Sequence, residues 1–493
     1  MNLYSHHWKS FIRNERWRRN LLTKILFGIL ILYFIVLFLV LGLNIGRILR
    51  QLEGDPVDRF NSFLLWYLPV DLFLRCLFQP LPTVEILPYL RLPIHRGQIV
   101  KYLLHRSLMN LFNLIPWFVI IPFAIQILLP QSGPGIVVIY LTVMTLLLLF
   151  NNFLAVLIGF MIQKRPILYV IPFGLQALII SLNNWGFPVS VLSVSFGKYI
   201  LDANPALLGT LLSAILLIIY ATSRLLSRNF YIDEIQSKKE RKNFITLIGE
   251  NQFKQFGEIG RYLSLEISLL VRNKRPRQMM VMVPIIIIYF MFIISNSKHP
   301  FGPFFNLIVV TSLIGYGANN YGQFIFSWES SYFDCIIARK NSFANYVKAK
   351  YYLLSALSIL SFIPLFIFFG YMQTIDPYLI CSVLIFILGV NSFIILFFST
   401  FNDGRMDLSR SRFFNYQGIK GNQFMLSLIF IFLPIGIFSL FKYYFNPVIG
   451  EIVIAISGLI FIILSKWWIK SIIVPQFQRR KYKNLDGYRN LSL

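Results

Sequence analysis

Charged residues are scarce in this chain of 493 residues, at 13% against about 25% in a typical soluble domain. Acidic residues are the scarcest, because 20 Asp and Glu stand against 46 Lys and Arg. Hydrophobic residues make up 57% and come in long runs, and residues 25–43 hold 19 residues without a charge. A helix of that length crosses a hydrocarbon core of about 30 Å. Because backbone polar groups in lipid must be satisfied within their own segment, we expect an all-α polytopic membrane protein.

Cysteine and histidine are also rare, and their spacing excludes several kinds of site. Cys76, Cys335 and Cys381 have no paired spacing, so they predict neither a disulfide framework nor a metal site. His95 and His105 lack the nearby carboxylate or cysteine spacing that zinc requires. We therefore expect no metal site and no catalytic residues.

Two motifs are missing as well. No small-x-small cleavage site follows the first apolar run, so we expect this run to stay as a membrane anchor. No G-x-x-x-x-G-K-[ST] phosphate loop occurs, so the chain has no Walker nucleotide site. The longest predicted cytoplasmic stretch, residues 227–278, is too short for an ATPase domain. We expect no cofactor in this chain and no enzyme activity of its own.

The apolar runs predict twelve membrane-spanning helices. Placing the N-terminus in the cytoplasm puts 39 Lys and Arg beside cytoplasmic segments and six beside outer ones, which is the positive-inside asymmetry. Both termini are then cytoplasmic. The net charge of +26 reflects this topology and contact with anionic lipid, and it calls for no nucleic-acid partner. The predicted spans are residues 25–43, 60–79, 102–128, 136–162, 166–182, 206–226, 279–296, 304–326, 350–371, 377–401, 425–443 and 448–468.

The two halves of the sequence resemble each other, with matches in the same order along the chain. The matching pairs are 13–16 (RNER) with 272–275 (RNKR), 31–36 with 287–292, 84–85 with 328–329, Pro116 with Pro364, and 151–154 (NNFL) with 391–394 (NSFI). Each match is weak alone, but their shared order predicts a duplication. We expect two parallel six-span repeats, residues 1–235 and 236–493, related by an axis along the membrane normal.

Each repeat begins with a segment that is typical of an amphipathic helix in the cytoplasmic interface. Residues 4–20 alternate aromatic and basic side chains. Residues 253–272 place one apolar face on a helix, made of Phe253, Phe256, Ile259, Leu263, Ile267 and Leu270. We expect Lys and Arg of these segments to reach the lipid headgroups while Trp and Phe lie in the boundary. The alternative is that they are ordinary positive flanks of a span.

The loop between the second and third span of each repeat has a common pattern. Residues 82–106 and 327–350 both have a glutamate near their start, continue through an aromatic and an aliphatic stretch to a basic turn, and end in a helix that enters the membrane with a lysine. This pattern predicts a short helix at the cytoplasmic surface, joined rigidly to two spans. Such an element can transmit force from a soluble partner.

These features resemble the ABC-2 type exporter permeases. Leu92-Pro93-Ile94-His95-Arg96 stands where that family has Leu-Pro-hydrophobic-Ser-Arg, and the six-span unit with a preceding interfacial helix is similar too. The second half departs from the pattern, because residues 337–340 lack the proline. The whole chain also resembles an uncharacterised bacterial family of permease-like proteins with two fused halves. This second resemblance implies the bacterial cytoplasmic (inner) membrane.

The resemblance to ABC-2 permeases implies that these loops are coupling helices, which dock in a groove of a cytoplasmic ATPase subunit. It implies two ATPase copies as partners, with ATP and Mg²⁺ bound on them. The candidate contact residues are Glu85, Tyr89, Arg96, Glu329, Phe333, Arg339 and Lys340. The alternative is that these residues only anchor a loop.

Polar residues inside the predicted spans are further candidates. Asp71 and Arg75 lie four apart, on one face of the second span, where they can mark a transport path or neutralise each other as a brace. Asn319 and Asn320 of the eighth span suit interhelical hydrogen bonds or the lining of a path. Residues 183–205, the longest outer loop, are apolar enough to dip into the outer interface.

Three functions remain open from the sequence. The first is the membrane subunit of an ABC exporter. The second is a secondary, ion-coupled transporter with 6+6 parallel repeats, for which the long helical loop after the second span is unusual. The third is a membrane-embedded lipid- or sugar-modifying enzyme, which needs a cluster of carboxylates or a histidine beside one, and the predicted spans contain none.

Overall fold

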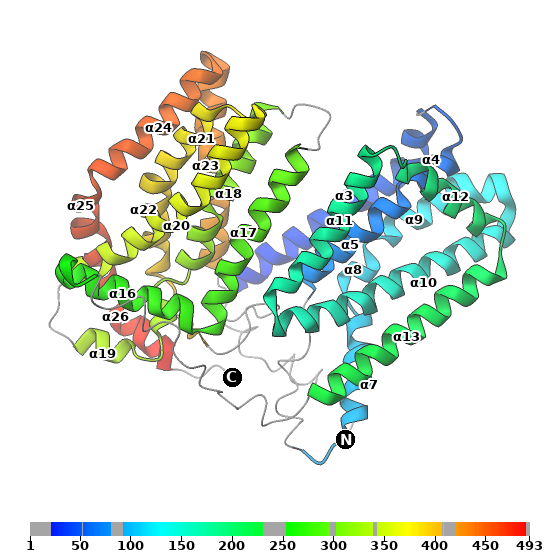
Figure 1. Ribbon diagram of the computed structural model, residues 1–493, viewed down its shortest axis with the longest axis horizontal. Coiled ribbons are helices and arrows are strands. Elements are labelled where there is room, and N and C mark those ends of the chain that lie inside the picture. The colour runs from blue at the N-terminus through cyan, green and yellow to red at the C-terminus, as the bar shows by residue number, and fades with distance from the viewer. Residues whose placement is uncertain are drawn as a thin grey trace. The chain divides into compact units, whose positions relative to one another are not determined.

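Helices form every regular element among the residues that the computed structural model describes, which are 21–51, 53–79, 92–229, 253–295, 302–338, 343–406, 408 and 421–489 (Figure 1). The chain divides into two units, residues 1–240 and 241–493, here called unit 1 and unit 2.

The helices of unit 1 are α3 (Leu21–Gln51), α4 (Pro56–Ser62), α5 (Leu64–Phe78), α7 (Arg96–Leu108), α8 (Leu111–Leu114), α9 (Trp117–Phe123), η2 (Ala124–Leu128), α10 (Leu129–Lys164), η3 (Pro166–Tyr169), α11 (Val170–Asn184), α12 (Val189–Leu201) and α13 (Pro205–Asn229). The helices of unit 2 are η4 (Lys254–Phe256), α16 (Gly257–Arg272), α17 (Lys274–Ser295), α18 (Pro303–Gly322), η5 (Ser327–Glu329), α19 (Phe333–Ala338), α20 (Phe343–Met372), α21 (Pro377–Phe386), η6 (Ile387–Asn391), α22 (Ser392–Ser399), α23 (Gly421–Tyr444), α24 (Pro447–Ile463), α25 (Ser465–Trp468), η7 (Ile469–Ile473) and α26 (Val474–Arg489).

Several helices begin at an Asp-Pro or Asn-Pro pair. The side chains of Asp55 and Asp376 accept hydrogen bonds from backbone N–H groups two residues on, at the starts of α4 and α21. Asn204 does the same for Ala206 at the start of α13. The following proline fits because the first helical N–H has no partner to lose. These pairs therefore fix where the chain re-enters helix after a turn.

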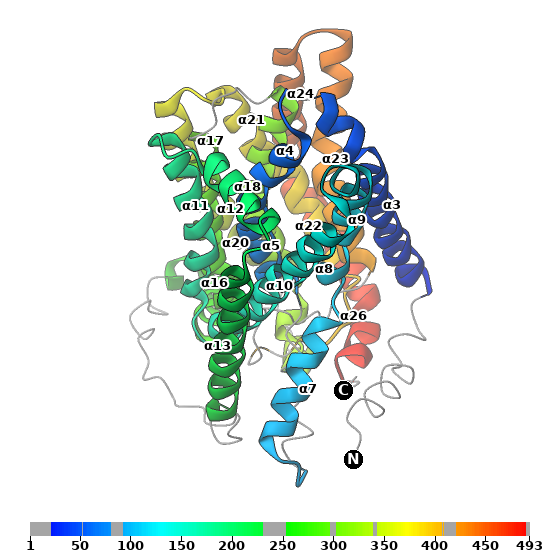
Figure 2. The same cartoon turned by 90° about the vertical axis from the view of Figure 1, so that its right-hand side faces the viewer.

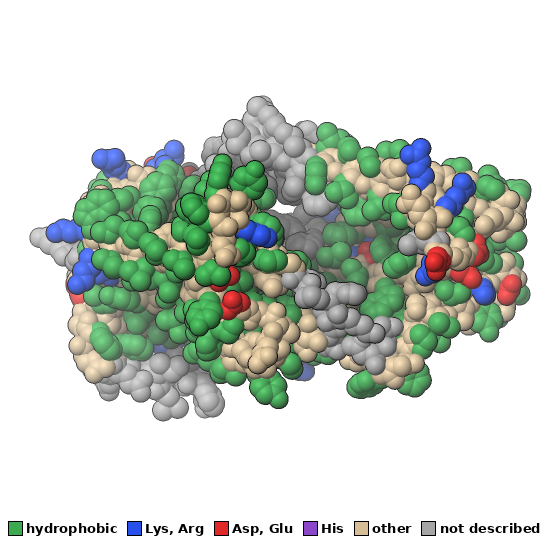
Figure 3. All heavy atoms as spheres, turned by 90° about the horizontal axis from the view of Figure 1, so that it is seen from above, with side chains coloured by type: hydrophobic (Ala, Val, Ile, Leu, Met, Phe, Trp, Pro, Cys, Tyr) green, Lys and Arg blue, Asp and Glu red, His purple; other side chains and the backbone are tan. Residues whose placement is uncertain are grey.

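Seven helical segments among the described residues are long and apolar enough to cross a membrane, or eight if the bent pair of α24 and α25–α26 counts as one span. Many of their apolar side chains are exposed, including Leu217, Leu360 and Ile463. Seen from above, hydrophobic side chains cover much of each unit and charged ones are few (Figure 3). Exposed apolar helix surface on this scale belongs against lipid, so the chain is an all-α membrane protein.

The candidate span from Leu111 to Ile162 has 52 residues, more than twice the length of about 20 that one crossing needs. It contains the π-helix η2 and then a kink at Gly133, where φ is +77° and Pro134 follows. A residue with a side chain would be strained at this φ, so glycine permits the kink. The sequence predicted two spans here, 102–128 and 136–162, and the kink lies between them, but residues 102–108 belong to the separate helix α7.

Unit 1 packs around α10. One group of buried residues joins α7, α10 and α13, and includes Val100, Leu103, Phe153 and Ile218. Residues 183–205, predicted as an outer loop, contain helix α12, which packs on α4 through Ser193 and Gly197. The Ser193 hydroxyl donates to the carbonyl of Asn61 and accepts from the N–H of Leu65.

Unit 2 has one helix that lies across the others. Figure 1 shows α16 running across the direction of α17 and α18, as expected for a helix at an interface. Its buried side contains Gly260, Glu266, Leu269 and Leu270. The face predicted from the sequence is thus shifted, because only Leu270 of that set is fully buried while Phe256 is exposed. The shift brings a charged residue, Glu266, to the inside.

Helices α21 and α24 of unit 2 cross with backbone against backbone. A Cβ atom on Gly389, in the π-helix η6, would overlap the carbonyl oxygen of Gly458. A Cβ on Gly458 would in turn lie 2.5 Å from the carbonyl carbon of Ile385. Small residues at such a crossing let two membrane helices approach closely.

Replacing Gly389 by alanine should lower the stability of the chain by an amount in the upper part of the range of about 1–3 kcal/mol that overpacking costs. The added methyl group meets backbone atoms, which cannot rotate away as a side chain can. Gly436 on α23 is the matched control, because nothing lies within 4 Å of its Cβ position. Gly436→Ala should stabilise its helix by up to about 1 kcal/mol. Thermal unfolding in detergent compares the two, and equal effects would contradict the close crossing.

Candidate functional site

A cluster of buried charges lies in unit 2 where the chain leaves α18. Glu266 belongs to α16, Glu329 to η5 and Lys350 to α20, and they are 2%, 5% and 0% exposed. The Lys350 ammonium forms an ion pair with Glu266 and lies 3.1 Å from Oε2 of Glu329. One cation therefore joins helix α16, which lies across the others, to the candidate span α20 and to the loop after α18, which leads from α18 to α19. We call these three residues the buried triad.

Hydrogen bonds from two tyrosines add to the ion pairs of the buried triad. The Tyr321 hydroxyl donates to Glu266 at 2.6 Å, and the Tyr346 hydroxyl donates to Glu329. Lys350 also donates to the backbone carbonyl of Ile325 at 3.0 Å. Buried charges are costly unless they are both paired and hydrogen-bonded, and these meet both conditions.

The buried triad has two carboxylates and one ammonium, so one negative charge is in excess. Burial raises the pKa of Glu329 to about 8, because the attraction of Lys350 does not offset the loss of water, and Glu266 adds repulsion. Glu329 therefore holds a proton in the folded chain at a pH where an exposed glutamate has lost it.

This raised pKa predicts a pH dependence of stability. In the unfolded chain Glu329 releases its proton above a pKa of about 4.3, whereas in the folded chain it keeps the proton up to a pKa of about 8. The stabilisation that protonated Glu329 gives to the fold is therefore complete below about pH 4.3 and is lost as the pH rises through 8. We expect a lower unfolding temperature in detergent at pH 8 than at about pH 5. Glu329→Gln should remove this difference, because glutamine does not titrate. The same slope in both proteins would contradict the assignment to Glu329.

Trp328 packs the same loop against α17. Its side chain is fully buried, its indole N–H donates to the carbonyl of Tyr321 at 3.0 Å, and the Arg275 guanidinium lies over its ring at 5.9 Å. Arg275 belongs to the stretch 272–275 that matches 13–16 in the first half, and it follows directly on the segment 253–272. It is buried under the loop and packs on an aromatic face.

Helix α26 holds the loop from the other side. The ring of Phe477 lies 4.9 Å from that of Phe326 and 5.9 Å from that of Phe333, between centroids. Tyr488 packs edge-on against Phe333 at 5.0 Å, and its hydroxyl donates to the carbonyl of Asn402. Aromatic pairs of this geometry add to the stabilisation from buried area. We call the contacts of Phe477 and Tyr488 with the loop the aromatic clamp.

The structure separates the predicted ATPase-contact residues into three groups. Glu329 and Phe333 are buried in the triad and the clamp, so they position the loop and do not form its surface. Arg96 is exposed in the first turn of α7, after His95, whose side chain accepts from the N–H of Gly97. Four members lie outside the described residues: Glu85, Tyr89, Arg339 and Lys340.

Asp71 and Arg75, predicted as polar residues inside a span, meet within unit 1. Both are buried on α5, with Nε of Arg75 2.6 Å from Oδ2 of Asp71. Arg75 also donates to Asn113 at 2.6 Å and to the carbonyl of Phe112 at 2.8 Å. Asn151 donates to Asp71 at 2.5 Å. The charges are thus paired and hydrogen-bonded by α5, α8 and α10, which is the arrangement of a brace.

Asn319 and Asn320 make different contacts. The Asn391 amide, on η6, donates to Asn319 at 3.1 Å, which links α18 to the fourth predicted span of the second half. The Asn320 amide donates to the carbonyl of Tyr316, one turn back on its own helix. Asn319 is therefore an interhelical contact, whereas Asn320 has a contact within its own helix.

Sequence reasoning missed Glu266 and the role of Lys350. Glu266 is the one acidic residue in the second half of its helix, among mostly apolar neighbours, and Lys350 begins a long apolar run. A charge at either place is a signal of pairing, but the partner is 84 residues away and the sequence does not name it.

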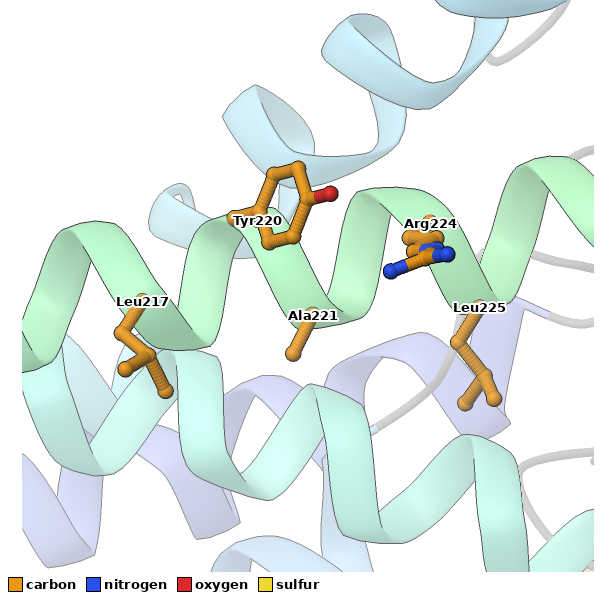
Figure 4. A pocket seen from close by; sticks show the side chains of 5 residues that line it. All are labelled: Leu217, Tyr220, Ala221, Arg224 and Leu225. Carbon is orange, nitrogen blue, oxygen red and sulfur yellow. The ribbon is translucent and has the colours of Figure 1, made fainter.

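One surface groove lies along α13, lined by Leu217, Tyr220, Ala221, Arg224 and Leu225 (Figure 4). All five residues belong to one helix and most are apolar, which is typical of a lipid-facing surface. Among the described residues, no group of three or more His, Cys, Asp or Glu side chains could hold a metal ion.

Comparison with known proteins gives a family but no activity. A family model matches residues 7–491, almost the whole chain, and is described as a family of unknown function (DUF5687). No curated protein and no solved structure matches the chain.

Proposed function

We propose that this chain, which belongs to the DUF5687 family of unknown function, is the membrane-spanning subunit of an ABC-type exporter driven by a separate cytoplasmic ATPase. In this proposal it has twelve spans in two parallel six-span repeats, lies in the bacterial inner membrane with both termini in the cytoplasm, and binds two ATPase copies. ATP and Mg²⁺ then belong to the partner.

The observation that carries the proposal is the fixation of the loop after α18. The buried triad ties this loop to α16 and α20, and the aromatic clamp ties it to α26. A loop outside the apolar segments that is held so firmly to a span moves with it as one body. An ATPase that moves the spans by docking on a loop requires such a rigidly held loop. A loop that only connects two spans does not need to be held in this way.

The buried positions of Glu329 and Phe333 refine the proposed contact surface. The exposed residues of α19, which include Asp334 and Cys335, take the contact with the ATPase in unit 2. In unit 1 the exposed start of α7 takes it, with Arg96. Val100 and Leu103 bury the other side of α7 against α10 and α13, so this helix is also fixed to two spans.

A pair of equivalent contacts supports the two-repeat part of the proposal. The offset of 244 residues that matches Glu85 with Glu329 also matches Arg75 with Asn319, and the offset of 240 matches Asn151 with Asn391. In unit 1 Asn151 contacts the Asp71–Arg75 pair, and in unit 2 Asn391 contacts Asn319. In each half the aligned asparagine of the fourth predicted span thus makes a polar contact with the second span, at Asn319 in unit 2 and at Asp71, one turn before the aligned Arg75, in unit 1.

The test is purification of the tagged chain from its native membranes in mild detergent, with identification of the soluble proteins that accompany it. We expect a stoichiometric ATPase, and we expect Arg96→Glu with Asp334→Lys to reduce its recovery at least tenfold. Lys198→Glu is the matched charge reversal on α12, which Figures 1 and 2 show at the other end of unit 1 from α7, and it should retain the ATPase.

Cys335 gives an independent readout of the same contact. It is exposed on α19, whereas Cys76 is buried, so a photoreactive maleimide should label it selectively over Cys76. We expect the label to cross-link to the ATPase. A chain that purifies alone, under conditions that keep other ABC complexes intact, would overturn the proposal.

The second candidate function is an ion-coupled secondary transporter. The observation in its favour is the buried Asp71–Arg75 pair inside a predicted span. In that case the chain in proteoliposomes, without any ATPase, should release protons on addition of substrate extracts, and Asp71→Asn should abolish the release. In the exporter, Asp71→Asn alters only stability.

A further inference from the structure

Basic residues accumulate where the chain leaves the apolar helix α24. After α24 the axis bends by 56° into the segment Ser465–Arg489. Between Glu451 and Asp486 the sequence has six Lys and Arg and no acidic residue. Figures 1 and 2 both show α26 at the opposite end of unit 2 from the start of α24.

The bent segment has two distinct sides. Ile469, Ile473 and Phe477 are buried against the unit, and Arg480 lies over the ring of Phe401 at 4.6 Å. The outer side carries Lys466, Lys470, Arg479 and Lys483, all exposed, together with Trp467 at 58% and Tyr482 at 62% exposure. We call this outer side the basic face.

No ion pair neutralises the four cations of the basic face among the described residues. Their neighbours Trp467 and Tyr482 are side chains that settle at the boundary between hydrocarbon and water. The face also begins one turn after Ile463, whose side chain is among the most exposed apolar ones of α24. Positive charge and interfacial aromatics thus start where the lipid-facing surface ends.

We propose that the basic face binds the headgroups of anionic phospholipids in the membrane leaflet at this end of unit 2. A single soluble anion does not match its dimensions, because Lys466 and Lys483 are 17 positions apart, about 25 Å along a helix. Several headgroups side by side span that length. A polybasic segment directly after a membrane helix gains attraction from each charge that reaches an anionic surface. This binding does not depend on the proposed ATPase.

The experiment measures phospholipid bound to the full purified chain. The chain in detergent is incubated with mixed micelles of phosphatidylcholine and phosphatidylglycerol. The amount of each lipid that the chain retains after gel filtration is then quantified by mass spectrometry of the extract. The test variant carries Lys466→Gln, Lys470→Gln, Arg479→Gln and Lys483→Gln. The matched control keeps the charge, with Lys466→Arg, Lys470→Arg, Arg479→Lys and Lys483→Arg.

We expect the affinity for phosphatidylglycerol to fall about fivefold for each side chain neutralised, while retention of phosphatidylcholine stays the same. The charge-retaining control should bind as the unaltered chain does. If the variant with all four substitutions elutes as an aggregate, the double variant Lys466→Gln, Lys470→Gln tests the same expectation while removing half as many charges. Unchanged phosphatidylglycerol binding in a folded variant, or an equal loss of both lipids, would overturn the proposal.

Discussion

Replacing Lys350 by methionine is expected to lower the free energy of unfolding by about 3–5 kcal/mol, because it removes one partner from a buried charge cluster. Methionine fills a similar volume, so the loss is electrostatic rather than steric. The Glu266 carboxylate would be left buried beside Glu329 without a cation, and it would have to take up a proton or draw in water. Thermal unfolding in detergent, followed by tryptophan fluorescence, measures the loss.

The control for this substitution is Lys348→Met, two residues earlier on α20. Lys348 is only half-buried, and its replacement should change stability within about 0.5 kcal/mol. The triple variant Glu266→Gln, Glu329→Gln, Lys350→Met should recover much of the stability, since it removes every charge together. If Lys350→Met unfolded at the same temperature as the unaltered chain, the buried triad would not hold the loop.

Arg75→Leu should cost unit 1 a similar amount, about 3–5 kcal/mol. The guanidinium group neutralises Asp71 and donates to Asn113 and to the carbonyl of Phe112, so its removal leaves a buried carboxylate and two acceptors without their donor. The loss should appear in the unfolding of the full chain, and as faster proteolysis of unit 1 than of unit 2.

Arg224→Leu on α13 is the matched control, because that arginine is exposed at the end of a candidate span. Its replacement should leave stability nearly unchanged. Asp71→Asn combined with Arg75→Leu should be milder than Arg75→Leu alone, since no unpaired charge then remains. A double variant as unstable as the single one would show that Arg75 acts through its packing and not through Asp71.

Much of the fold could be predicted from the sequence because membrane-spanning helices consist of long runs of apolar residues. Residues 350–371 and 425–443 fall inside α20 and α23, and Asp376-Pro377 starts α21 as such pairs do. The break between the third and fourth predicted spans is signalled by Gly133-Pro134. These features are local, so a window of about twenty residues is enough to predict them from the sequence.

The candidate site could be predicted only in part, because it is made of contacts between distant segments. The four-residue spacing of Asp71 and Arg75 predicted a contact, and that contact is present. The apolar face drawn for 253–272 omitted Glu266, since a carboxylate on a buried face makes sense only with Lys350 beside it. Glu329 and Phe333 were predicted as residues that contact an ATPase, yet Lys350 and Phe477 cover them. The roles of the remaining predicted contact residues stay predictions.

The aromatic clamp also constrains the order in which unit 2 is made. Phe477 and Tyr488 lie on α26, more than 130 positions after the loop that they hold, and Lys350 follows Glu266 by 84. A ribosome releases these residues in sequence, so Glu266 on α16 has no cation beside it until α20 has emerged. The loop lacks its aromatic contacts for longer, until α26 has emerged. The loop after α18 therefore reaches its packed form only once α26 has left the ribosome.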